Sequence, residues 1–125
     1  AVVATPAPAE FALHPALPPI HFDFEKHDIK PREAVILEAN AQWLKAHPDY
    51  LLLIEGHCDE RGTSEYNLAL GDRRARSTMT YLVSRGVPAS RITTISYGED
   101  LPQCLASTEV CWSENRRAQL RVKPR

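Results

Sequence analysis

The 125-residue sequence contains no long apolar run, since no hydrophobic stretch approaches the roughly 18 residues that span a bilayer. It also lacks an excess of one charge: 15 lysines and arginines face 16 aspartates and glutamates, which leaves a net charge of −1. No overall positive field therefore attracts nucleic acid or acidic lipid. The opening residues carry neither the basic nor the apolar region of a signal peptide. A mature or trimmed protein, from which a signal peptide had been removed, would look the same.

Cysteine is scarce too, with three in the chain. Cys104 and Cys111 enclose six residues of a loop-like region, and no cysteine or histidine beside them suggests a metal site. A disulfide can close such a loop, and it would imply an oxidising compartment. Cys58 follows an apolar run and is predicted to be a buried, unreactive thiol.

The length allows one compact domain and is short for two. The composition, 43% hydrophobic and 25% charged, is that of an ordinary globular protein. Residues 1–19 hold five of the ten prolines and almost no charge, which predicts an extended, flexible linker. We therefore expect residues 20–125 to form the folded domain.

Hydrophobic periodicity predicts four strands and two helices. An apolar run centred on residues 51–54 indicates a strand buried on both faces. The predicted strands cover 20–24, 50–55, 91–97 and 118–123, and the helices cover 65–85 and a stretch from Pro31 to His47. This order predicts an α/β fold, with a mixed four-stranded βαβαββ sheet and helices packed on one face.

Further details of these elements follow from the same pattern. Gly86 is expected just beyond the end of the second helix, and residues 99–115 are expected to form a long connection. The last strand alternates apolar and polar residues, which predicts one solvent-exposed face. Core-facing positions are predicted at Ile36, Leu37, Ala41 and Leu44 of the first helix and at Leu68, Ala75, Met79 and Leu82 of the second.

A candidate site lies where the central strand ends. Asp59 closes that strand, and Arg74 lies fifteen positions later in the early turns of the next helix. Open α/β sheets commonly bind ligands at the carboxyl ends of their strands. One fixed anion and one fixed cation suit a zwitterionic ligand that carries an ammonium and a carboxylate. The alternatives are an internal salt bridge between the two residues, or a loop-capping role for Asp59.

The residues around this pair resemble a known family. The stretches 56–63 and 66–75, which include Gly-His-Cys-Asp-Glu-Arg-Gly-Thr, resemble the OmpA-like peptidoglycan-binding domain and, within it, the peptidoglycan-associated lipoprotein branch. Supporting motifs are Phe-Asp-Phe-Glu at 22–25, Ser-Tyr-Gly-Glu at 96–99 and Ser-Glu-Asn-Arg-Arg-Ala at 113–118. The resemblance covers residues 20–123 in consistent order.

The resemblance implies a non-enzymatic domain without a cofactor, which holds the diaminopimelate of the peptidoglycan peptide stem. By the same resemblance, Asp59 takes the ammonium of that residue and Arg74 its carboxylate. The supporting pocket positions are Asn67, Leu70, Arg61, Phe24 and Glu25. The family usually has aspartate where this chain has Glu25, so that contact depends on whether the backbone or the side chain binds.

The resemblance also implies a location and partners. The branch is periplasmic and tethers the outer membrane to the cell wall through a lipid anchor, whose cysteine this chain does not contain. Its protein partner is the periplasmic propeller protein TolB. One alternative is the wall-anchoring domain of a flagellar stator or porin. Another is a peptidoglycan hydrolase or metalloenzyme, in which His57 and Asp59 would need a third ligand such as His21 or His27.

Overall fold

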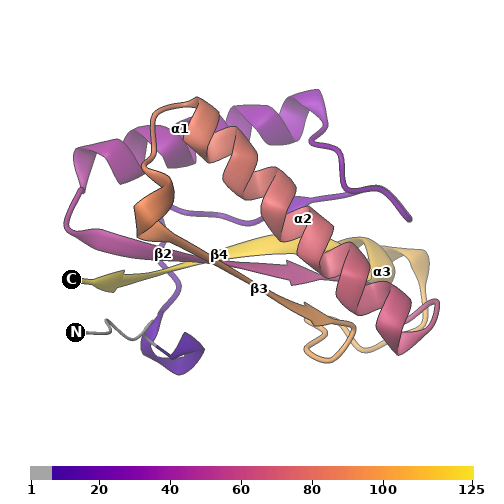
Figure 1. The fold of residues 1–125 in the computed structure, drawn as a ribbon. Coiled ribbons are helices and arrows are strands. Elements are labelled where there is room, and N and C mark those ends of the chain that lie inside the picture. Colours follow the sequence, from indigo (N-terminus) through magenta and orange to yellow (C-terminus); the bar gives the residue numbers. More distant parts are fainter. Residues whose placement is uncertain (1–6) are drawn as a thin grey trace.

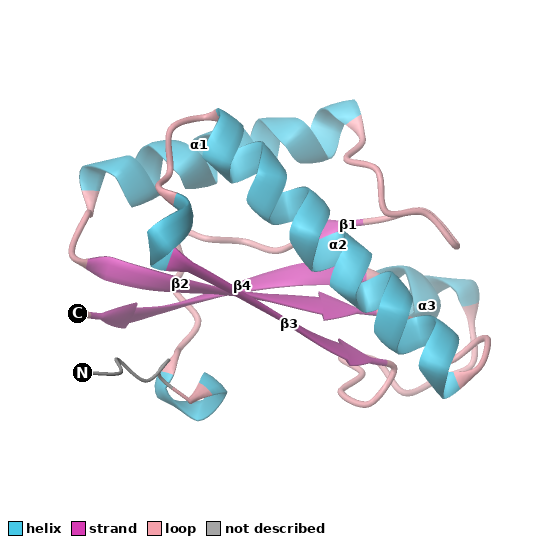
Figure 2. Ribbon diagram, in the orientation of Figure 1, coloured by secondary structure: helices cyan, strands magenta, loops and turns pink. Residues whose placement is uncertain are grey.

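A mixed four-stranded sheet forms the centre of the computed structural model, which describes residues 7–125. The strand order is β1-β4-β2-β3, with β2 parallel to β3 and antiparallel to β4, and β4 antiparallel to β1 (Figure 2). The strands are β1 (Ile20–His21), β2 (Tyr50–His57), β3 (Ile92–Gly98) and β4 (Arg117–Pro124). The predicted α/β fold with a mixed sheet is confirmed.

Two long helices, α1 (Pro31–Ala46) and α2 (Ser64–Ser84), cover the same face of this sheet (Figure 1). Pro31 opens α1, and the Thr63 hydroxyl caps α2 by accepting a hydrogen bond of 3.1 Å from the amide of Tyr66. Gly86 follows α2 with a φ of 99°, a conformation that favours glycine. The core between these layers contains Leu37, Ala41, Leu44, Leu52, Ile54, Ala75, Leu82, Leu120 and Val122.

The first half of α2 approaches the sheet more closely than its sequence predicts. A Cβ atom on Gly56 of β2 would overlap the carbonyl oxygen of Gly71, so the helix and the strand touch backbone to backbone. Leu68, predicted to face the core, is 45% exposed, whereas Asn67 and Arg74 are buried. The prediction was wrong at Leu68 because this part of α2 turns a polar face toward the end of β2.

The N-terminal segment differs from the predicted linker. Ala12 and Val122 of β4 exchange two backbone hydrogen bonds of 2.8 Å, so the chain continues the sheet edge beyond β1. Phe11 is 5% exposed and Leu17 is 1% exposed. Apolar burial and edge pairing therefore order a proline-rich stretch that composition alone assigns to a flexible linker. Residues 1–6 of the predicted linker lie outside the described residues.

Three short helices were not predicted: η1 (Pro8–Glu10), η2 (Ala89–Arg91) and α3 (Glu109–Asn115). The helix α3 lies within the predicted connection 99–115, and Thr108 caps it by accepting a hydrogen bond from the amide of Cys111. β1 is shorter than predicted, because the chain turns at Phe24 and Glu25 soon after the amide of Phe22 bonds the carbonyl of Arg116.

The predicted solvent-exposed face of β4 is also largely covered. Arg117 and Gln119 are buried, and Arg121 donates a 3.0 Å hydrogen bond to Glu55 of β2. Glu55 also lies 3.2 Å from the ring of His57. Glu55 therefore bonds Arg121 across the two strands and His57 within β2, whereas Arg117 Nε and His57 Nδ1 are buried without a hydrogen-bond partner among the described residues.

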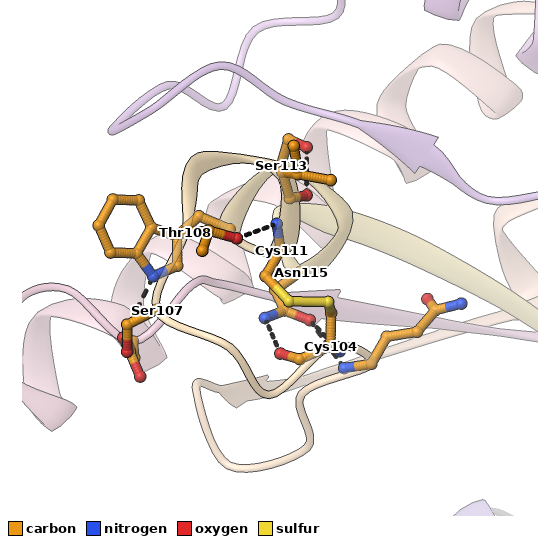
Figure 3. The surroundings of a disulfide bond; sticks show 10 residues. Cys104, Ser107, Thr108, Cys111, Ser113 and Asn115 are labelled. Carbon is orange, nitrogen blue, oxygen red and sulfur yellow. Dashed lines mark hydrogen bonds between the residues drawn. A yellow bond between two sulfur atoms is a disulfide. The ribbon is translucent and has the colours of Figure 1, made fainter.

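A disulfide joins Cys104 to Cys111, whose Cα atoms are 5.0 Å apart (Figure 3). Asn115 of α3 braces the same loop: its Oδ1 accepts hydrogen bonds from the amides of Gln103 and Cys104, and its Nδ2 donates to the carbonyl of Cys104. Cys58 is a free, buried thiol, and burial raises its pKa to about 11. The loop is thus fixed by one covalent bond and three hydrogen bonds.

Candidate functional site

One pocket at the carboxyl end of β2 gathers the residues that the sequence singled out. The loop after β2 contributes Asp59 and Arg61, and the loop between β1 and α1 contributes Phe24 and Glu25. Cys58 also follows β2, and α2 contributes Tyr66 and the buried residues Asn67, Leu70 and Arg74. The complete lining is Phe24, Glu25, Cys58, Asp59, Arg61, Tyr66, Asn67, Leu70 and Arg74. All seven predicted site residues therefore lie around one space. That space holds about 10 Å³, roughly one water molecule.

Asp59 is 4% exposed and is paired with arginines other than Arg74. Its Oδ1 accepts hydrogen bonds from the backbone N (3.0 Å) and Nε (3.1 Å) of Arg61, and its Oδ2 accepts one from Nη2 (2.8 Å). Arg116 Nη1 lies 3.5 Å from Oδ2. Burial alone would raise the pKa of Asp59, but Arg61 and Arg116 outweigh it and hold the pKa below its ordinary value.

Arg74 is fully buried and holds three segments together. It donates hydrogen bonds to the carbonyl oxygens of Lys26 (Nε, 2.9 Å), His57 (Nη1, 2.9 Å) and Asp23 (Nη2, 3.1 Å). Burial lowers its pKa from the ordinary value, yet an arginine guanidinium stays charged in proteins. Because the guanidinium has five N–H donors, one N–H on each terminal nitrogen lies outside these three bonds, and the Cys58 thiol is a further neighbour of Arg74.

Asn67 fixes the loop that carries Asp59. Its Nδ2 lies within hydrogen-bond distance of the carbonyl oxygens of Asp59 (3.3 Å) and Arg61 (3.0 Å) and of the carboxylate of Glu99 (3.1 Å). Its side chain is buried, so these contacts order the loop rather than face solvent. Leu70, buried on the same helix face, supplies an apolar wall.

The rim of the pocket is aromatic and strained. The guanidinium carbon of Arg61 lies 3.8 Å from the centre of the Phe24 ring and 4.1 Å from that of Trp112. Glu25 has a φ of 60°, an uncommon conformation for a residue other than glycine. A hollow of about 310 Å³ lies outside the rim, lined by Phe24, Glu25, Arg61, Gly62, Thr63 and Tyr66.

Sequence reasoning missed the contribution of α3 and the start of β4. Arg116 reaches Asp59, donates to the carbonyl of Phe22 (2.9 Å) and pairs with Glu109 (3.0 Å). Trp112 covers Arg61 from the same side. The motif at 113–118 belongs to the family resemblance, but Arg116 lies 57 positions from Asp59 and no local spacing connects the two residues.

The histidines of the alternative metal site contact other groups in the described part of the chain. His57 faces Glu55, His21 lies 3.8 Å from Glu33, and His27 bonds Ser77. Within residues 7–125 no group of three histidines, cysteines or acidic residues is placed to hold a metal ion. The same part of the chain has no helix long and apolar enough to cross a bilayer.

Known proteins confirm the resemblance. The model of the OmpA family matches residues 21–117. The chain belongs to the OmpA family. Among curated OmpA-family relatives, the peptidoglycan-associated lipoprotein of Rhizobium meliloti is 54% identical over 99 residues, which cover 79% of this chain and 56% of the relative. That of Haemophilus influenzae is 48% identical over 101 residues, covering 81% and 66%. The chain thus spans little more than half to two thirds of these relatives.

Solved structures agree with this membership. The peptidoglycan-associated lipoprotein from Burkholderia pseudomallei is 40% identical with a TM-score of 0.81, covering 84% of this chain and 89% of that one. The C-terminal domain of Helicobacter pylori MotB has a TM-score of 0.80 over 86% and 85% at 19% identity, which shows a common fold alone. The OmpA-family chain is a homologue of peptidoglycan-associated lipoproteins. The printed names of these relatives describe association with peptidoglycan.

Proposed function

We propose that this domain binds the peptide stem of peptidoglycan non-covalently, with Asp59 receiving the ammonium of diaminopimelate and Arg74 its carboxylate. The main support is that Asp59 and Arg74 line one pocket without being paired with each other. A buried anion and a buried cation that do not neutralise one another can each bind the opposite charge of one ligand. The names of the relatives, which describe association with peptidoglycan, supply the class of ligand.

The pocket chemistry fits such a ligand. Arg74 has one N–H on each terminal nitrogen outside its three carbonyl bonds, and Asp59 can accept from an ammonium once the Arg61 side chain has left its carboxylate. Leu70, Phe24 and Tyr66 offer apolar surface to the aliphatic chain between the two charges. Low exposure of both charged groups strengthens the pairing relative to a surface salt bridge.

The neighbouring groups favour binding over hydrolysis. The Cys58 thiol, with a pKa raised to about 11 by burial, donates to the carbonyl of Asn67 and is a poor nucleophile at neutral pH. His57 is directed to Glu55 rather than into the pocket lining. A peptidoglycan hydrolase is therefore disfavoured.

The relatives support a proposal for the cellular role. We propose that the domain works in the periplasm and tethers the cell wall to the outer membrane through a lipid anchor outside this sequence, with a TolB-like propeller protein as partner. The lipoprotein names support the anchor, and a disulfide suits an oxidising compartment. A flagellar stator or porin is less well supported, because the similarity to MotB is limited to the fold.

A sedimentation experiment tests the ligand. The domain is incubated with insoluble peptidoglycan that contains diaminopimelate, and the bound fraction is measured for the parent, Asp59→Asn and the control Asp72→Asn. Asp72 pairs with Arg76 on the exposed side of α2, so its variant should bind like the parent. Asp59→Asn should lose at least tenfold in affinity, because the amide cannot pair with an ammonium.

Two further measurements complete this test. Peptidoglycan with lysine at the same position lacks the carboxylate for Arg74 and should be retained less. Equal binding of the parent and Asp59→Asn would refute the site, and soluble fragments released by the parent would support the hydrolase instead.

A further inference from the structure

Arg61 already occupies the position where a ligand cation would meet Asp59. Its Nη2 lies 2.8 Å from Oδ2 and its Nε 3.1 Å from Oδ1 of the carboxylate, so the planar fork covers both oxygens. The hydrogen bond to Asp59 also raises the pKa of Arg61. The remaining space of about 10 Å³ is too small for an amino acid side chain. An ammonium cannot approach Oδ2 while Arg61 keeps this geometry.

The surroundings hold Arg61 in place without locking it. Its guanidinium is stacked between Phe24 and Trp112, at 3.8 and 4.1 Å from their ring centres. The side chain is 30% exposed and adjoins the outer hollow of about 310 Å³. Glu109, an exposed residue of α3 whose Oε1 pairs with Arg116, has its Oε2 at 3.9 Å from the same Nη2. Arg61 can therefore move outward to a second carboxylate and stay against aromatic surface.

We infer that Arg61 is an internal substitute for the ligand's ammonium, and that binding exchanges the two cations at Asp59. Nη2 and Nε of Arg61 leave the carboxylate, and the ligand ammonium takes their place at Oδ2. The backbone N–H of Arg61 still donates to Oδ1, and Arg116 still lies beside Oδ2, so Asp59 remains oriented throughout. This inference rests on the proposed function.

The exchange makes Arg61 a specificity-determining residue. A ligand whose side-chain amine is neutral interacts with the Asp59 carboxylate more weakly than Arg61 does. It therefore does not displace Arg61, and the pocket stays closed. A ligand with an ammonium replaces one charged contact with another. Arg61 thus lowers the affinity for every ligand, but it lowers the affinity for uncharged ligands most. The difference in affinity between charged and uncharged ligands therefore increases.

Calorimetric titration of a soluble stem peptide containing diaminopimelate tests the exchange. Arg61→Gln removes the resident cation and should bind this peptide about five- to tenfold more tightly than the parent. Arg61→Lys, which keeps the charge but loses the two-pronged geometry, should lie between them. Arg76→Gln, an exposed arginine that also pairs with an aspartate, is the matched control and should bind like the parent.

Two more readouts separate exchange from simple contact. The parent should prefer the charged peptide over its side-chain N-acetylated analogue by a larger factor than Arg61→Gln does. The NMR resonance of the Arg61 Nε–H should move on saturation with peptide, because that group loses its Asp59 acceptor. Circular dichroism confirms that each variant is folded.

The outcomes distinguish this inference from the proposed function. Weaker or unchanged binding by Arg61→Gln, with a parent that binds, would show that Arg61 is a direct ligand contact or a bystander and would overturn the exchange alone. Failure of the folded parent and of Arg61→Gln to bind the stem peptide would overturn the proposed function and the exchange with it.

Discussion

Arg74 of α2 donates a 2.9 Å hydrogen bond from Nη1 to the carbonyl oxygen of His57, the last residue of β2. The same guanidinium bonds the carbonyls of Asp23 and Lys26 in the loop before α1. One buried side chain that lines the pocket therefore joins a helix, a strand and a loop. The cation proposed to bind the ligand is also a structural element, so its removal affects stability and binding together.

Stability measurements on Arg74→Ala should show this double role. Three carbonyl oxygens lose a charged donor in a buried position, where each unsatisfied group costs about 1–3 kcal/mol. We expect a loss of at least about 3 kcal/mol in the free energy of unfolding, measured by urea denaturation. Arg76→Ala, on the exposed side of the same helix, should change it by less than about 0.5 kcal/mol. Equal stability of the two variants would show that the three contacts contribute little.

The approach of α2 to β2 should not tolerate a side chain. Gly56→Ala places a methyl group against the backbone of Gly71, which cannot move independently of the helix, and should cost about 3 kcal/mol. Gly71→Ala meets mainly the hydroxyl oxygen of Ser96. Its cost should be smaller and should fall further in the double variant with Ser96→Ala, as read from thermal unfolding. Additive effects of the Gly71 and Ser96 changes would contradict this explanation.

Thiol chemistry should distinguish the three cysteines. Denatured, non-reduced protein should contain one reactive thiol, Cys58, whereas three thiols would rule out the bond between Cys104 and Cys111. In the native protein at pH 7, alkylation of Cys58 should be slow because the thiol is buried and its pKa is about 11. Cys104→Ser with Cys111→Ser should lower the free energy of unfolding by about 2 kcal/mol, the effect expected for a short closed loop.

Acid should remove the stabilising effect of Asp59. Its pKa in the folded protein lies below the ordinary value of 3.8, so the ionised form is favoured by folding. The resulting stability is complete above pH 3.8 and is lost as the pH falls through the lower pKa of the folded state. At pH 7 Asp59→Asn should be less stable than the parent by about 2 kcal/mol, the size of a charged hydrogen bond. Denaturation at pH 7, 4.5 and 3 should show this gap narrowing at the lowest pH, and a constant gap would contradict the assignment.

The sequence correctly predicts the helices and strands whose positions depend on nearby residues alone. The apolar run 51–54 marks β2, and Pro31 and Gly86 mark the start of α1 and the end of α2, because proline and glycine act through their own backbone. Periodicity fails at Leu68, where burial depends on the close contact of Gly56 with Gly71 rather than on the helix itself. Composition fails at Phe11 in the predicted linker, because its burial requires pairing of its neighbour Ala12 with a strand more than a hundred positions away.

The site also combines residues that local sequence predicts with residues that only the folded structure brings together. A motif places Asp59, Asn67 and Arg74 around one pocket because they lie on adjoining elements of the chain. Arg116 and Trp112 come from the other end of the sequence, and only the packing of α3 brings them to Asp59 and Arg61. The spacing of Asp59 and Arg74 suggested that the two could form a salt bridge, but it gave no indication that Arg61 is the residue paired with Asp59.

The pairing of Ala12 with Val122 determines how a pulling force would act on the strands of the sheet. Val122 pairs with Leu52 near the start of β2, whereas the pocket lies beyond its end, so the N-terminal segment and the pocket are at opposite ends of the sheet (Figure 1). Tension between a held ligand and the N-terminal segment would run parallel to β4. Backbone hydrogen bonds there would be loaded together in shear rather than broken one at a time, the arrangement in which a small sheet resists pulling best.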